Sequence, residues 1–403
     1  MRIYLHDYAG HPFQVQLARS FAARGHTVRH GYSSTNVTPH GMLARREGDP
    51  DEFEPDPIAL GRVIDKSQSS LIGLRARQKN EREYGGRVVE HLSLFKPDVV
   101  IAANTPLDAL NAIQSWCLAN EVPLVNWLQD LISVAAHRLL RLRFPVFGAL
   151  AGRYYSALER RILRHSDAIV VITEDFRPIL RRWGISMARV TAIENWAPID
   201  DLPIRPQANA WSSAHGLDKK RVLLYSGTLG MKHNPALLLR LAERFRGDEG
   251  IRVVVITEGP GAEWLRGHVA AARLDNLLLL PYQPFEVLPD VLGAAEVLLA
   301  VLEPDAGVYS VPSKVLTYLC AGRPLLLAVP DENLAARIVA RVGAGVVVSP
   351  TEPASFVDEA VGLLADEARR VESGQRARAY AEATFDLVRI TDRFEGVLKS
   401  VRR

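Results

Sequence analysis

The sequence predicts an α/β fold of two Rossmann-like, doubly wound parallel sheets, one in each half of the chain. Three observations predict it: short continuous apolar runs alternate with longer helical patterns, the alternation lapses near the middle, and it then resumes. Continuous apolar strands that alternate with helices are typical of parallel sheets covered on both faces. At 403 residues the chain is long enough for two domains, each with its own core.

The first half opens with an expected strand and helix whose boundaries are well marked. The helix over 12–24 begins at Pro12, where the fixed φ of proline suits the first turn, and it stops before Gly25. Each later strand is again followed by a helical stretch. The strands expected in this half are 2–5, 27–30, 97–102, 123–127 and 168–173.

Between about Asn195 and Lys220 the alternation gives way to prolines and short polar residues, which is typical of a linker between domains. We therefore expect a first domain over 1–197, a second over 215–385, and a cleft between them. A terminal helix over 386–403 is expected to pack back on the first domain. The strands expected in the second half are 221–225, 251–256, 277–280, 297–302 and 325–329.

Composition narrows the class of protein. Hydrophobic residues make up 48% and charged residues 24% of the chain, as in globular proteins. A net charge of +3 is too small to indicate nucleic acid as a partner. Cys117 and Cys320 lie in apolar helical patterns without metal-ligand spacing, so we expect neither disulfide nor metal, and a cytoplasmic protein. The first residues read as a strand, and no apolar run reaches the roughly 18 residues of a membrane span.

The stretch Ser310–Pro324 is the strongest chemical signal in the chain. It lies between two apolar strands and carries the start and stop signals of a helix. Its loop would bring Ser310, Ser313 and Lys314 to the helix N-terminus. The free N–H groups and partial positive charge of such a terminus attract phosphate. The stretch therefore predicts a site for a nucleotide diphosphate.

Three further loops follow strands of the second half, at the edge of the sheet where ligands bind in open α/β folds. Gly227 would let the backbone approach a ligand, and Lys232 would add a positive charge on the same side. The second loop begins with Glu258 and Gly259, and the third carries Tyr282, whose ring could receive a nucleobase. An ordinary strand-to-helix turn remains the alternative for each loop.

The first half offers two candidates for contact with the substrates. Asp130 follows a strand and could act as a base or position an acceptor hydroxyl, although an aspartate here could also cap a helix. Gly10 would allow close approach after the first strand, and His11 could contact a donor phosphate or the acceptor. A purely structural histidine is the alternative.

Basic and aromatic residues are interleaved between His137 and His165, in a region with helical periodicity. Arg138, Arg164 and five arginines between them alternate with leucine, phenylalanine and tyrosine, and only Glu159 offsets their charge. Such a pattern suits the surface of an anionic membrane. A solvated arginine face over an apolar stripe is the competing interpretation.

Taken together, these landmarks resemble glycosyltransferase family 4, whose fold is GT-B, and in particular its bacterial polysaccharide members of the colanic-acid and O-antigen type. The resemblance covers nearly the whole chain, and the order and spacing of the landmarks carry it. They are His6–His11, Ala22–His26, Leu128–Leu131, Ser166–Asp167, Ile193–Trp196, Tyr225–Lys232, Glu258–Pro260, Val311–Lys314 and Ala321–Pro324.

The resemblance implies transfer of a sugar from a UDP- or GDP-sugar to a hydroxyl acceptor, often lipid-linked, in cell-surface polysaccharide or glycolipid synthesis. It also implies retention at the anomeric carbon, no metal ion, and no cofactor besides the nucleotide-sugar. Lys232 would clamp the diphosphate, and Asp130 and His11 are the candidate catalytic residues. The candidate donor-binding residues are Gly10, Gly227, Thr228, Lys232, Glu258, Gly259, Tyr282, Ser310, Ser313, Lys314 and Thr317.

The chain departs from the family pattern at the donor site. Tyr309 and Thr317 occupy the places of the usual pair of glutamates, and Thr228 replaces the usual arginine or asparagine. Donor recognition is therefore expected to rest on Lys314, its neighbouring serines and Glu303. The departures leave two alternatives open: a non-catalytic binding subunit with this fold, and a nucleotide-sugar epimerase.

Overall fold

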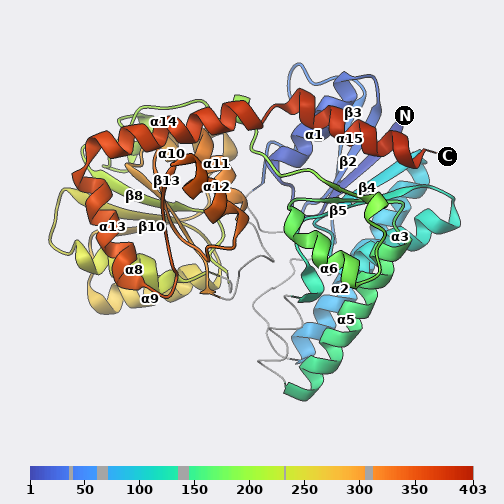
Figure 1. Cartoon of the computed structure of the whole chain (residues 1–403), viewed down its shortest axis with the longest axis horizontal. Helices are drawn as coiled ribbons and strands as arrows, with labels where there is room; N and C mark the ends of the chain where they lie inside the picture. The colour runs from blue at the N-terminus through green and yellow to red at the C-terminus, as the bar shows by residue number, and fades with distance from the viewer. Residues whose placement is uncertain (36–39, 61–70, 135–144, 231–232, 305–311, 403) are drawn as a thin grey trace. The chain divides into compact units, whose positions relative to one another are not determined.

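A computed structural model describes residues 1–35, 40–60, 71–134, 145–230, 233–304 and 312–402. The chain forms two compact units (Figure 1): unit 1 is residues 1–194 with 387–403, and unit 2 is residues 195–386. The expected linker thus belongs to unit 2. Its Asn209 side chain donates to the Asp290 carbonyl at 2.9 Å, and its Trp211 indole donates to Gln283 at 3.0 Å. The cleft expected between the domains stays a prediction.

Unit 1 is built on a seven-stranded sheet in the order β3-β2-β1-β4-β5-β6-β7, with every neighbouring pair parallel. The sequence pattern did not predict β3 and β7. β3 contains Pro55 and Pro57, which are unfavourable in the interior of a sheet. Proline is tolerated here because β3 lies at the edge of the sheet. The strands are β1 (Arg2–Asp7), β2 (Thr27–Ser33), β3 (Phe53–Ile58), β4 (Val99–Ala103), β5 (Leu124–Leu128), β6 (Ala168–Val171) and β7 (Val190–Ala192).

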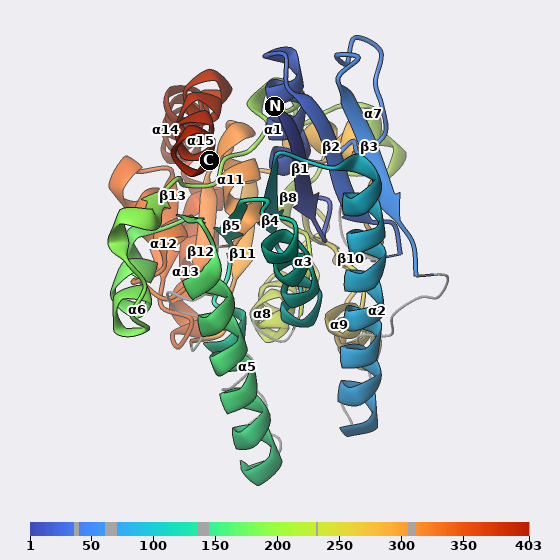
Figure 2. The same ribbon diagram turned by 90° about the vertical axis from the view of Figure 1, so that its right-hand side faces the viewer.

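Helices cover the sheet of unit 1, and two of them, α2 and α5, extend well beyond its strands in both views (Figures 1 and 2). The core between α2, α3, α5 and the sheet holds fully buried side chains such as Tyr84, Ile113 and Ile162. The helices are α1 (Pro12–Ala23), α2 (Leu71–Phe95), α3 (Leu107–Ala119), α5 (Pro145–His165), α6 (Arg177–Arg182) and α15 (Leu387–Val401), with the 3₁₀ turns η1 (Glu174–Phe176) and η2 (Met187–Arg189).

Unit 2 is built on a six-stranded sheet in the order β10-β9-β8-β11-β12-β13, again with parallel neighbours. The two sheets confirm the predicted pair of Rossmann-like folds. Only the short edge strand β13 escaped the sequence analysis in this half. The strands are β8 (Arg221–Ser226), β9 (Ile251–Ile256), β10 (Leu277–Leu280), β11 (Val297–Val301), β12 (Leu325–Ala328) and β13 (Gly345–Val348).

The core of unit 2 includes Leu223, Leu241, Val255 and Phe356, which come from both strands and covering helices and are 0% exposed. The helices are α7 (Ala210–Ala214), α8 (Pro235–Arg244), α9 (Pro260–Ala272), α10 (Leu288–Gly293), α11 (Ser313–Cys320), α12 (Leu334–Val342), α13 (Pro353–Ala365) and α14 (Glu367–Thr384), with the 3₁₀ turns η3 (Ile199–Asp201) and η4 (Phe285–Val287).

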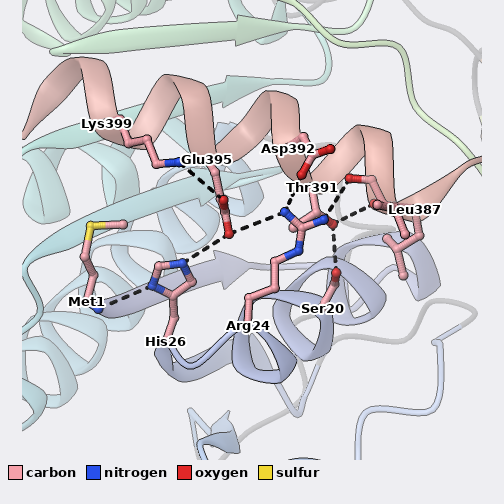
Figure 3. A network of polar contacts seen from close by, with 10 residues as sticks. Met1, Ser20, Arg24, His26, Leu387, Thr391, Asp392, Glu395 and Lys399 are labelled. Carbon is pink, nitrogen blue, oxygen red and sulfur yellow. Dashed lines mark hydrogen bonds and ion pairs between the residues drawn. The ribbon is translucent and has the colours of Figure 1, made fainter.

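The last helix, α15, belongs to unit 1 and packs beside α1. Its Phe394 is fully buried, with its ring centroid 4.7 Å from that of Trp127. A polar network borders this contact (Figure 3): Thr391 shares a hydrogen bond of 2.8 Å with Ser20, and Glu395 lies 3.3 Å from His26. The helix therefore completes the core of the unit that contains the first residues of the chain.

Both sheets have a point where the chain connections reverse direction, and this point locates the sites described below. In unit 1 the first strand lies between β2 and β4, and in unit 2 the first strand lies between β9 and β11. The helices on either side of such a point diverge, which leaves room for ligands beyond the carboxyl ends of the strands. The loops after β1, β4, β8 and β11 therefore lie where ligands bind in sheets of this kind.

Candidate functional site

The loop after β1 is shaped by a buried carboxylate. Asp7 ends the strand, is fully buried, and accepts hydrogen bonds from the backbone N–H groups of Ala9 at 3.1 Å and of His11. The chain turns at Gly10, whose φ is +72°, and a β-carbon there would lie 2.7 Å from Leu43. Glycine is therefore needed at this position for both conformation and space.

His11 lies at the start of α1, with its Nδ1 atom 3.3 Å from Asp7 and 3.2 Å from the side-chain nitrogen of Asn104. Burial lowers the pKa of His11, but the charge and hydrogen bond of Asp7 outweigh it, and the charge of Asp130 adds to them. The net result is a His11 pKa above the ordinary value. The fold thus brings His11 and Asp130, the two candidate catalytic residues, close enough for their charges to interact.

Asp130 lines a pocket of about 170 Å³ in unit 1, at the carboxyl ends of β4 and β5 and against α3 and α5. The turn after it presents backbone N–H groups at Ile132 and Ser133, the donors that a helix-capping aspartate would bind. Both groups donate to Glu159 of α5, at 3.1 and 3.2 Å. A second carboxylate therefore stands beside the candidate catalytic aspartate.

Glu159 corrects an expectation from the sequence, which counted it as the one acidic residue that offsets the charge of the arginines between Arg138 and Arg164. The residue is only 2% exposed and lines the same pocket, so it does not neutralise the exposed face of α5. It also accepts the Ser133 hydroxyl at 2.5 Å. Burial raises the pKa of Glu159 to about 7, although its hydrogen bonds oppose the shift and Asp130 adds to it. Helical periodicity alone could have flagged it, because Leu158 and Ile162, one residue before and three after it, are buried.

In unit 2, Lys314 reaches from the first turn of α11 to the loop after β8. Its Nζ atom lies 3.6 Å from the centre of the Tyr225 ring, donates to the Tyr225 hydroxyl, and donates to the Thr228 carbonyl at 3.2 Å. The chain passes Lys314 at Gly227, where φ is +125° and a β-carbon would lie 3.1 Å from the lysine Cε. The predicted lysine and the predicted glycine loop are therefore one site.

Two more predicted loops meet this site. The Tyr282 hydroxyl donates to Thr228 at 3.3 Å, and its backbone N–H donates to Glu258 at 3.1 Å. Burial raises the pKa of Tyr282, so its hydroxyl stays protonated as a donor. Gly259 starts α9 with φ at +87°. These contacts gather the ends of β8, β9 and β10 with the start of α11.

The remaining residues predicted to bind the sugar donor lie on or near α11, or outside the described residues. Thr317 lies one turn after Lys314 and is partly buried, and Ser313 is exposed at the start of α11. Lys232 and Ser310 lie outside the described residues, so their roles stay predictions. Tyr318 was not predicted from the sequence; its hydroxyl accepts the Ser226 N–H at 2.8 Å and donates to the Ser226 carbonyl at 3.0 Å. This bond fixes α11 against β8.

Two further findings concern the described residues only. Across the described ranges, no three histidine, cysteine, aspartate or glutamate side chains are grouped as a metal ion would require. In the same part of the chain, no helix is long and apolar enough to cross a membrane.

Two Rossmann-like sheets, each with candidate residues beyond its carboxyl ends, are the architecture of the GT-B fold. Comparison with known families agrees: the Glycosyl transferase 4-like domain matches residues 11–196, and Glycosyl transferases group 1 matches residues 207–381. The chain belongs to the bacterial members of glycosyltransferase family 4. Its similarity to WcaI of Escherichia coli (strain K12), a glycosyl transferase assigned by name to colanic acid biosynthesis, is 24% identity over 304 residues, or 74% of this chain and 73% of that protein.

Solved structures support the same fold. Alr3699/HepE of Anabaena, solved in complex with UDP-glucose, has a TM-score of 0.70 and 15% identity, with 99% of this chain and 100% of that chain covered. Sucrose-phosphate synthase from Thermosynechococcus elongatus has a TM-score of 0.73 and 15% identity, with 100% and 99% covered. At such identities the likeness is one of fold.

Proposed function

We propose that this glycosyltransferase moves a sugar from a UDP- or GDP-sugar to a hydroxyl of a lipid-linked acceptor, with retention, in the synthesis of a cell-surface polysaccharide or glycolipid. The observation that carries the proposal is the convergence of Lys314, Gly227, Thr228 and Tyr282 at one edge of the unit 2 sheet. The UDP-glucose bound by Alr3699/HepE and the name of WcaI support the donor and the pathway class.

Each part of the unit 2 site has a role in this proposal. Lys314 pairs with the diphosphate and stabilises the negative charge that develops on the leaving nucleotide. Gly227 lets the backbone approach the phosphates, because a β-carbon would crowd that lysine. Glu258 and Tyr282 bound the position of the base. Lys232, outside the described residues, is expected to add a second positive charge.

The unit 1 site supplies the acceptor side. Asp130 orients the acceptor hydroxyl or takes its proton, and His11, held by Asp7, contributes a positive charge near the reacting groups. Neither role calls for a metal ion. We expect turnover to be unchanged after treatment with EDTA, and a loss that Mg²⁺ or Mn²⁺ restores would contradict this part of the proposal.

The proposal is tested by incubating the purified protein with UDP- and GDP-linked glucose, galactose and mannose. Thermal shift reports binding, and release of free nucleotide reports turnover. We expect one nucleotide to stabilise the protein and one of its sugars to be consumed. Absence of binding to every nucleotide would contradict a donor site, and binding without turnover would favour the non-catalytic alternative.

We further propose that α5 rests on an anionic membrane surface. Its described outer face carries Leu150 and Tyr154, which are 58% and 46% exposed, together with exposed Arg153 and Arg160. Because Glu159 points inward, no acidic side chain of the described part of α5 offsets these arginines. Arg153→Glu is expected to reduce sedimentation with phosphatidylglycerol vesicles, and unchanged partitioning would favour a solvated face.

A further inference from the structure

A continuous row of aromatic rings lies behind the unit 1 site. The ring centroid of Phe394, on α15, is 4.7 Å from that of Trp127, on β5, and the two rings meet at 62°. The Trp127 ring lies 5.7 Å from Phe13 of α1 at 74°, and Phe13 lies 5.5 Å from the imidazole of His11 at 45°. Phe394, Trp127 and Phe13 are each at most 4% exposed. The row therefore runs from α15 to a candidate catalytic residue.

Trp127 is the member of this row that meets both candidate catalytic loops. It is the last residue but one of β5, and the chain runs from it through two further residues to Asp130. All four of these residues line the unit 1 pocket. The Trp127 ring also contacts Phe13, which lies in the first turn of α1, two residues after His11. A shift of this ring would therefore displace the loop after β5 and the loop after β1 together.

The geometry of the row is suited to holding these loops in place. Aromatic rings attract each other edge to face, at about 4.5–7 Å between centroids, because the positive edge of one ring meets the negative face of the next. Both contacts of Trp127 have this form. Close-packed interiors transmit displacement, since no void lets one ring move alone. Phe394 thus braces Trp127 on the side of α15, and Phe13 carries the contact on toward the site.

The atom that depends on a fixed ring position is Nδ1 of His11. It lies 3.3 Å from Asp7 and 3.2 Å from the side-chain nitrogen of Asn104, which requires one orientation of the imidazole. Burial lowers the pKa of His11, whereas the carboxylates of Asp7 and Asp130 raise it, with a net result above the ordinary value. If Phe13 no longer held the imidazole, the ring would turn away from Asp7 and the His11 pKa would fall.

We propose that Trp127 is a positioning residue for the unit 1 site, and that Phe394 braces it from α15. Trp127 sets the orientation of the His11 imidazole through Phe13, and it sets the place of Asp130 through the end of β5. This role deepens the proposed function, on which it rests only in giving His11 and Asp130 a part in the reaction. Because α15 follows unit 2 in the sequence, the unit 1 site is complete only when that helix is docked.

The test is NMR titration of the His11 imidazole in the full chain, labelled on histidine and assigned with His11→Gln. In Trp127→Leu the His11 pKa should fall toward the ordinary value, because the imidazole loses its fixed place beside Asp7. Phe394→Leu should shift it in the same direction, because the brace behind Trp127 is lost. Trp127→Phe keeps an aromatic ring and should hold the wild-type value. An unchanged His11 pKa in both leucine variants would overturn the proposal.

Phe53→Leu is the matched control for loss of stability. Phe53 is 0% exposed in the same unit, but it begins β3, at the amino end of the sheet and four strands from β5. The substitution removes the same atoms as Phe394→Leu. It should lower the thermal unfolding temperature and leave the His11 pKa at the wild-type value. A fall of the His11 pKa equal to that in Phe394→Leu would overturn the proposal, because general loosening of unit 1 would then account for both.

Turnover separates the positioning role from the proposed function. Misplacement of a reacting group by about 1 Å can cost about 10²-fold, so Trp127→Leu should lower kcat by about tenfold or more. The KM for the nucleotide-sugar should not change, since the donor edge lies in unit 2. A kcat of Trp127→Leu equal to that of the wild type would overturn the positioning role. If the wild type consumes no nucleotide-sugar while the His11 titration behaves as expected, the proposed function fails and the positioning of His11 stands. If the wild type turns over but the His11 titration responds to neither leucine variant, the positioning role alone fails.

Discussion

The two units have the same sheet arrangement around their first strand, but carboxyl groups predominate among the described groups of the unit 1 site and not of the unit 2 site. The unit 1 site holds Asp7, Asp130 and Glu159 with His11 beside them, whereas the unit 2 site holds Lys314 among tyrosine hydroxyls with Glu258 nearby. The loop after β1 shows how the difference arises, because Asp7 takes two of its N–H groups internally. The fold thus provides the place of binding, while the side chains after each strand set which charged groups a ligand would meet.

The strongest way to break this comparison is to remove the cation of unit 2. Lys314→Met keeps the length of the side chain but removes the charge that would stabilise the leaving diphosphate. Turnover of the preferred nucleotide-sugar should fall about 10³-fold, or about 4 kcal/mol of transition-state stabilisation. Nucleotide release measures it, and thermal shift measures the accompanying loss of nucleotide affinity.

Lys219→Met is the matched control, because Lys219 is exposed and precedes β8, at the opposite edge of the same sheet. It should turn over donor at the wild-type rate. If Lys314→Met also keeps the wild-type rate and affinity, the charge contrast between the units has no functional meaning.

The pH dependence of stability tests whether Glu159 of the unit 1 site is protonated in the folded protein. The Glu159 pKa lies at about 7 in the folded protein against an ordinary value of 4.5, so between these values the folded state holds a proton that the unfolded state has lost. The contribution of Glu159 to the stability of the wild type therefore falls as pH rises through this window and levels above it. Relative to wild type, Glu159→Gln should gain on the order of 3 kcal/mol from about pH 4.5 to above pH 7.

Thermal unfolding of the variant and the wild type across that range measures the gain. Glu90→Gln serves as control, because Glu90 is exposed on α2 and its charge is solvated in both states. A difference between Glu159→Gln and wild type that does not change with pH would show that the folded Glu159 is ionised throughout the window.

The two sites differ in how much of them the sequence could predict. The glycine turn at Gly227 and the Lys314 helix start are local signals, and strand order then brings them to one edge. Helical periodicity could have flagged Glu159 as inward-facing, but not its partner turn at Ile132, which lies 27 residues earlier and is joined to it only by tertiary packing. β3 was missed for a related reason: at a sheet edge, pairing on one side overrides its prolines.

A substitution at Asp130 tests whether the unit 1 site takes part in the reaction. Asp130→Asn keeps the size and hydrogen-bonding capacity but removes the base and its charge, so kcat should fall about 10²-fold, or about 2.7 kcal/mol. Affinity for the donor nucleotide should not change, since the donor edge lies in unit 2. Asp98→Asn, at the amino end of β4 where Asp98 accepts the Arg2 N–H at 2.7 Å, is the control. An Asp130→Asn enzyme within twofold of wild type would remove Asp130 from the reaction.

The units also differ in continuity, since unit 1 needs α15 from the end of the chain whereas unit 2 is one segment. Glu395, which is 15% exposed, lies 3.5 Å from Arg24 and 3.3 Å from His26, while Asp392 pairs with the same arginine but is 60% exposed (Figure 3). Glu395→Gln should destabilise unit 1 by about 1 kcal/mol and Asp392→Asn by about 0.3 kcal/mol, because solvent screens the exposed pair. Thermal unfolding of the two variants compares them. If neither variant changed the unfolding temperature, burial of Phe394, and not the polar network, would hold the helix in place.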